Sequence, residues 1–125
     1  MKKLFSALFS IIVSATVLGQ NVTYTDLSNP NEAKLNGVFH FNFDNTFTED
    51  QLTKASNFYT EHFTAEYKET SVGFEATITI VSDDQLSRRV LERYFATLGI
   101  QKIGIDGSFL EVRPFLMKFI MLPQE

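Results

Sequence analysis

Phenylalanine alternates with polar residues between Val38 and Asp44, and this alternation restricts the fold more than any other feature of the chain. Phe39, Phe41 and Phe43 fall on one side of an extended segment, and His40 and Asn42 fall on the other. A period of two is typical of a strand that is buried on one face and exposed on the other. The sequence therefore predicts a sheet with one aromatic face that must be covered.

A helical pattern follows this strand directly. Thr48 precedes Glu49-Asp50-Gln51, and a threonine with a glutamine three residues later is the signature of a capping box. Apolar residues at helical spacing then run from Leu52 to Phe63. We expect the first helix of the domain in this region.

Two more strands and a second helix continue the pattern. Residues 65–72 and 74–81 predict two strands joined by a turn, because apolar and polar residues alternate on either side of a glycine. A helix capped by Ser82 or Asp83 is expected to end before Gly99, which is a common helix terminator.

The end of the chain is strongly apolar. Residues 100–105 and 109–112 predict short strands on either side of an Asp106-Gly107 turn. Residues 115–122, among which only Lys118 is charged, predict a closing strand that is covered on both faces. Burial within the chain and association at an interface both explain such a strand.

This order of elements predicts an α+β fold. Strand, helix, strand, strand, helix, strand is the succession of the ferredoxin-like βαββαβ sandwich, in which two helices cover one face of an antiparallel sheet. We expect this domain over residues 38–125, with the closing strand as a C-terminal strand extension. Residues 20–37 contain many turn-forming residues and predict an irregular leader, with a short strand at residues 22–25.

The first nineteen residues have the pattern of an export signal. Lys2 and Lys3 precede an apolar stretch from Leu4 to Leu18, and Gly19 is small enough for cleavage before Gln20. A retained membrane anchor is the alternative, although the stretch is shorter than the roughly 20 apolar residues that a spanning helix needs. We expect a bacterial protein that is periplasmic or secreted, with no integral membrane segment after cleavage.

Composition excludes several kinds of site. The chain has no cysteine, so disulfides, thiolate metal ligands and cysteine nucleophiles are impossible. Its formal net charge of −4 argues against nucleic acid and anionic membranes as partners. The sequence contains none of the glycine-rich phosphate-binding loops or zinc-protease motifs, and we expect no cofactor.

The hydrophobic spacing from Phe39 to Asp106 resembles the heavy-metal-associated domain of copper chaperones and metal-pumping ATPases. That family has a methionine at the end of its first strand and two cysteines before its first helix. Aligned on Leu52, this chain has Phe43 in place of the methionine, and Asn45 and Thr48 in place of the cysteines. The resemblance implies the family's fold without its metal site, because neutral oxygen donors do not replace thiolates for Cu(I).

Three functional hypotheses follow. The first is an exported, non-catalytic binding or interaction domain, whose partner is a protein or a second copy of the chain. Its contact surface would lie on the closing strand, at Phe115, Phe119 and Met121. The second is metal handling, with copper bound by His40 together with Met117 or Met121. The third is an enzyme of unrecognised type.

Arginines on the second predicted helix form a further candidate surface. Arg88, Arg89 and Arg93 recur at helical spacing in an otherwise acidic chain. A solvated helix face explains them, and so does a docking patch for an acidic partner.

Overall fold

The computed structural model describes residues 22–82 and 84–122, and this part of the chain has an α+β fold with four α-helices and a six-stranded mixed sheet. The strands are β3 (Val22–Tyr24), β4 (Val38–Asp44), β5 (Phe63–Thr70), β6 (Gly73–Ile80), β7 (Lys102–Ile105) and β8 (Ser108–Glu111). The helices are α1 (Pro30–Asn36), α2 (Glu49–Asn57), α3 (Gln85–Thr97) and α4 (Val112–Phe115), which continues into the π-helical segment η2 (Leu116–Ile120).

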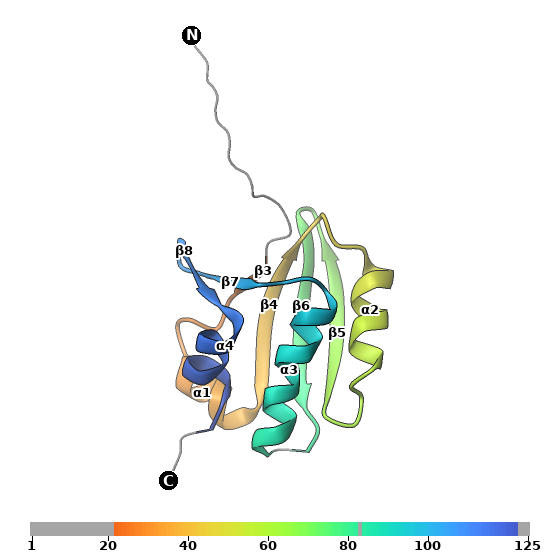
Figure 1. Ribbon diagram of the computed structural model, residues 1–125. Helices are drawn as coiled ribbons and strands as arrows, with labels where there is room; N and C mark the ends of the chain where they lie inside the picture. Colours follow the sequence, from red (N-terminus) through yellow and green to blue (C-terminus); the bar gives the residue numbers. More distant parts are fainter. Residues whose placement is uncertain (1–21, 83, 123–125) are drawn as a thin grey trace.

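The strands lie in the order β5-β6-β4-β3-β7-β8 (Figure 1). Neighbouring strands are antiparallel except β3 and β7, which are parallel. Helices α2 and α3 lie across the same face of this sheet (Figure 1). The opposite face carries the exposed polar side chains of the alternating strands, such as His40 and Asn42.

The aromatic row of β4 forms the centre of the core, as its alternation predicted. Phe39, Phe41 and Phe43 are at most 1% exposed. Burying side chains of this size supplies roughly 1.5–3 kcal/mol each relative to exposure, so this row is a large part of the driving force for folding. Helix α3 covers part of this row, with Phe95 packed on Phe41 and Tyr94 on Phe43.

Several local expectations are confirmed. Thr48 and Gln51 form the capping box at the start of α2, with the Thr48 hydroxyl accepting from the Gln51 N–H at 3.1 Å. Asp106 and Gly107 both have positive φ, 45° and 85°, in the turn between β7 and β8. The N-cap of α3 is Asp84 instead of Ser82 or Asp83, and Asp83 lies outside the described residues.

The sheet is more elaborate than the four antiparallel strands expected. Strand β3 comes from the predicted leader and lies between β4 and β7, and the same leader forms α1. Val22 and Tyr24 are buried in the core, since β3 pairs with a strand on each side. The short strand predicted at residues 22–25 is therefore confirmed, and the described part of the leader belongs to the folded unit instead of being irregular.

The closing strand predicted at residues 115–122 is wrong, because this segment is helical. Its buried residues follow a helical spacing of three and four, and its exposed residues lie between them. The buried residues of α4 and η2 are Val112, Phe115, Leu116, Phe119 and Ile120. A run that is apolar on all sides fits a strand and a helix equally well, and here the helical stripe places more of it on the core.

The expected export signal, residues 1–19, lies outside the described residues. Within the part that is described, none of the helices has the length and apolar character needed to span a bilayer.

Candidate functional site

A groove between α3 and the C-terminal helical segment is the main candidate site. Three adjoining hollows make up this α3–α4 groove, and Glu92 and Arg113 line all three. The groove is also lined by the side chains of Leu86, Arg89, Arg93, Leu116, Met117 and Met121.

The exposed face of α3 forms one wall of the groove. Asp84 caps the helix by accepting from the Ser87 N–H at 2.7 Å, and this bond lowers the pKa of the Asp84 carboxyl. The apolar stripe of α3, which includes Leu91 and Tyr94, faces the core, while Arg89 and Arg93 face outward. The predicted basic patch is therefore present on this wall.

The third arginine of that predicted patch lies elsewhere. Arg88 is 0% exposed, and its Nη1 donates to the Ile120 carbonyl oxygen at 2.7 Å. Its guanidinium also lies over the Phe39 ring, 5.7 Å from the centroid. Arg88 thus binds the C-terminal segment to α3 within the core. The third arginine at the groove is Arg113 instead.

Arg113 comes from the opposite wall and crosses the groove. Its Nε and Nη2 both donate to Glu92 Oε2, at 3.3 Å and 3.0 Å. Within the described part of the chain, no carboxylate lies within ion-pair distance of Arg89 or Arg93. The charged lining of the groove therefore comprises three guanidinium groups and the Lys102 ammonium, with the Glu92 and Glu111 carboxylates.

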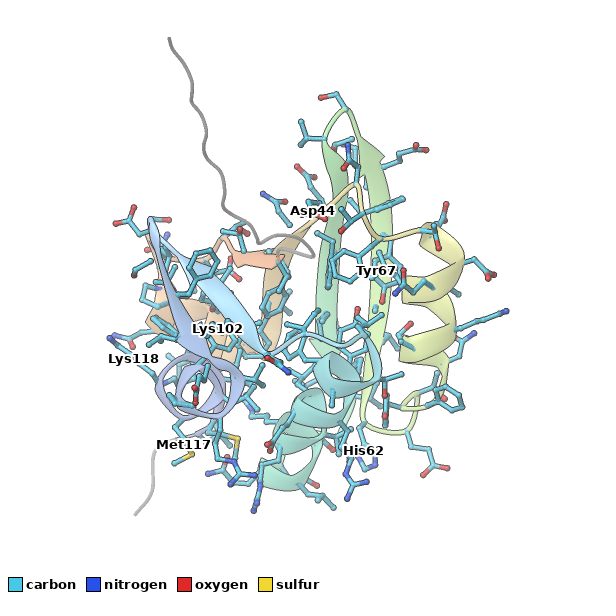
Figure 2. The ribbon with its side chains drawn as sticks, turned by 45° about the horizontal axis from the view of Figure 1, so that its top comes forward. Asp44, His62, Tyr67, Lys102, Met117 and Lys118 are labelled. Atoms are coloured by element: carbon cyan, nitrogen blue, oxygen red, sulfur yellow. The ribbon has the colours of Figure 1, made fainter. Side chains whose placement is uncertain are left out.

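The methionines predicted as metal ligands line this groove. Met117 is 60% exposed and Met121 is 7% exposed. Figure 2 shows Met117 on the outside of the C-terminal helical segment. The structure does not bring His40 to them, because His40 projects from the open face of the sheet. Among the described residues, no group of three or more His, Asp or Glu side chains is placed to hold a metal ion.

Of the contact residues proposed on the closing segment, Phe115 and Phe119 are buried and Met121 lines the α3–α4 groove. Phe115 is 0% exposed, Phe119 is 8% exposed, and Met121 is also buried. The Phe115 and Phe119 rings pack on Tyr24, with centroids 5.1 Å and 5.3 Å away. Strand β3 covers the apolar surface of these two rings within the chain, so Phe115 and Phe119 do not form the expected interaction surface.

His40 forms a second, smaller site on the open face of the sheet. The Asp26 carboxylate accepts from the His40 backbone N–H at 2.7 Å and lies 2.9 Å from Nδ1. A carboxylate only accepts hydrogen bonds, so Nδ1 carries a proton, and in the neutral ring Nε2 is then an acceptor. His40 lines a hollow together with Asn42, Glu75 and Thr77.

Asp26 also has a structural role that the sequence did not reveal. Strand β3 ends at Tyr24, and the Asp26 carboxylate then takes the His40 N–H that a longer strand would have bound. An aspartate directly after the short strand predicted at residues 22–25 is a weak signal for such a bond, because aspartate is common in turns.

A serine, a histidine and an aspartate also meet at the start of α3. His62 Nδ1 lies 3.1 Å from Ser87 Oγ, and Asp84 binds the Ser87 N–H. The aspartate contacts the serine instead of orienting the histidine, and Ser87 is 1% exposed. This arrangement caps a helix and does not present an activated nucleophile to a substrate.

The positions aligned with metal-binding cysteines have ordinary structural roles. Thr48 is committed to the capping box of α2, and Asn45 lies in the turn before it. No family model matches the chain, and comparisons with curated proteins and with solved structures found no match. Fold and site together define an α+β domain with an arginine-lined groove.

Proposed function

We propose that this protein is an exported, non-catalytic binding module that docks an acidic segment of a protein partner in the α3–α4 groove. The observation that carries the proposal is the position of Arg89, Arg93 and Arg113 around one groove, in a chain whose formal net charge is −4. A basic site on an acidic molecule selects acidic partners by charge complementarity.

The groove combines these charges with an apolar floor. Leu116 and Met121 form part of this floor, and the exposed Leu86 and Met117 border it. Methionine adapts to ligands of different shape, and arginine is enriched at protein interfaces. A peptide with glutamates next to leucine or phenylalanine matches this pattern.

Glu92 sets the position of Arg113 before a ligand arrives. The carboxylate side chain is 33% exposed and the Arg113 side chain is 73% exposed, so the pair is open to solvent. An exposed pair of this kind contributes about 0–1 kcal/mol. A carboxylate of the partner can therefore compete for Arg113 at little cost.

The proposal also includes a ferredoxin-like core for this domain. The proposal of a ferredoxin-like core is supported by the succession β4-α2-β5-β6-α3-β7, and β3 would be an insertion between the first and fourth strands of that core. Kinship with the heavy-metal-associated family rests on this succession and on the hydrophobic spacing. Export to the periplasm or the medium rests on the pattern of residues 1–19.

A peptide titration tests the docking proposal. The full chain is expressed in bacteria and purified in the form that the cells yield. Fluorescence anisotropy then compares a labelled peptide of alternating Glu and Leu with a matched peptide of alternating Lys and Leu. We expect only the acidic peptide to bind, with an affinity that falls as salt rises.

Charge reversals identify the surface. Arg89→Glu and Arg93→Glu should each weaken the acidic peptide about tenfold or more, because an attraction becomes a repulsion. Lys54→Glu on α2, far from the groove, is the matched control. Equal binding of both peptides, or no effect of the arginine variants, overturns the proposal. Binding to anionic vesicles in preference to the peptide also overturns it, in favour of a membrane surface.

A further inference from the structure

The strand β5 is an outer strand with a regular unpaired edge. It pairs with β6 over all eight of its residues, Phe63 to Thr70, and no other described strand pairs with it. It contains neither a proline nor a bulge. A regular edge of this length is a template for pairing with another chain unless something covers it.

The alternation of the ladder shows which backbone groups face outward. The Val81 N–H donates to the His62 carbonyl at 2.9 Å, so His62 and every second residue after it bond toward β6. The residues between them turn their N–H and C=O groups away from the sheet. The Phe63 N–H already bonds to the Tyr59 carbonyl, which leaves Ala65, Tyr67 and Glu69.

We propose that this edge pairs with β5 of a second copy of the chain, antiparallel, about a two-fold axis at Tyr67. In this register Tyr67 lies opposite the partner's Tyr67, and Ala65 lies opposite the partner's Glu69. These are the residues with outward backbone groups, so each opposed pair can exchange two hydrogen bonds. Pairing joins the two sheets into one and places both α2 helices on the same face.

Side-chain charges select this register. Glu66 and Lys68 are exposed on the open face, and in the described chain neither makes an ion pair. About the Tyr67 axis, Glu66 lies opposite the partner's Lys68, and the reverse pair forms by symmetry. Opposed residues of opposite charge stabilise a sheet, and like charges destabilise it.

Neighbouring registers lose this complementarity. A shift of the axis to residue 66 opposes Glu66 with the partner's Glu66, and a shift to residue 68 opposes two lysines. Within one copy, Lys68 already faces Glu75 across the ladder. The proposed pairing therefore sets each Lys68 between two carboxylates, while Glu66 gains its first opposite charge.

Sedimentation velocity of the full chain, purified in the form that bacteria yield, tests the pairing. We expect a reversible dimer with a dissociation constant below about 1 mM at low salt. Glu66→Lys and Lys68→Glu should each raise that constant about tenfold or more, because two attractions become two repulsions. The double variant that exchanges both charges should restore dimerisation to within about threefold of the unaltered chain.

Two further variants separate pairing from folding. Glu69→Lys makes the same charge change opposite an alanine and should leave the dimer unchanged. Ala65→Pro removes an outward N–H without touching the β6 ladder, so it should yield a folded monomer by circular dichroism. A monomer at every concentration, unaffected single variants, or a charge exchange that fails to restore the dimer overturns the proposal. The groove plays no part in this pairing, so either proposal can fail alone.

Discussion

The phenolic oxygens of Tyr67 and Tyr94 lie 2.6 Å apart, where β5, α2 and α3 meet. Tyr67 donates its proton to the Leu52 carbonyl of α2 at 3.1 Å, so Tyr94 is the donor between the two hydroxyls. Figure 2 shows Tyr67 beside α2. One chain of hydrogen bonds therefore ties both sheet-covering helices to the outer strand.

The direction of these bonds predicts an asymmetry between two conservative variants. Tyr67→Phe leaves the buried Tyr94 hydroxyl without an acceptor and should cost about 2 kcal/mol, whereas Tyr94→Phe should cost about 1 kcal/mol. Urea unfolding monitored by circular dichroism measures both values. A larger loss in Tyr94→Phe would contradict the assigned direction.

The same tyrosines predict loss of stability at high pH. Burial raises the pKa of Tyr67, and burial together with Tyr67 raises the pKa of Tyr94 well above its usual value. The stability that these two tyrosines contribute is fully present below about pH 10, where both hydroxyls also stay protonated in the unfolded state. Above that pH the unfolded chain ionises first, so the free energy of unfolding falls.

Unfolding midpoints at pH 9 and pH 11 check this pH dependence. The Tyr67→Phe/Tyr94→Phe double variant is the control, and its stability should fall less between those two values. An identical fall in both proteins would assign the effect to other groups.

Arg88 should be essential for the attachment of the C-terminal segment. Arg88→Ala removes the donor to the Ile120 carbonyl and the stacking on Phe39, and should cost about 3 kcal/mol. Arg88→Met keeps much of the apolar stem and should cost less. Hydrogen exchange of the Met121 N–H, which bonds to the Leu116 carbonyl, should accelerate in both variants. A loss under about 1 kcal/mol for Arg88→Ala would remove this role.

Gly73 and Gly107 should differ sharply when replaced by alanine. Gly73 has a φ of 154°, and a Cβ there would lie 1.9 Å from the Phe43 carbonyl oxygen. Gly73→Ala should cost more than about 2 kcal/mol, because backbone must move. Gly107 has positive φ but open space around it, so Gly107→Ala should cost about 1 kcal/mol. Thermal unfolding of both variants makes the comparison.

Asp26 should determine the tautomer of His40. Because the carboxylate accepts from Nδ1, neutral His40 should carry its proton there, and Asp26→Ala should favour the Nε2 form. Long-range nitrogen–proton correlation NMR at pH 8 distinguishes the two forms. An Nε2–H tautomer in the unaltered protein would show that the ring is not held by Asp26.

Part of the groove was predictable from the sequence and part was not. Arg89 and Arg93 follow from helical spacing on α3, since a helix places such residues on one face whatever it packs against. Arg113 joins them only because residues 112–120 fold as a helix beside α3. Arg88 is the neighbour of Arg89 in the sequence and has the same charge, but it lies on the side of α3 that faces the core.

The aromatic strand, the capping box and the Asp106-Gly107 turn were determined by the sequence itself, because each depends on residues that are close together in the sequence. Tertiary structure decided that β3 enters the sheet between β4 and β7, and that the last apolar run is a helix. Both outcomes depend on which packing buries the most apolar surface over the whole chain, and Tyr24 against Phe115 and Phe119 is the contact that joins them.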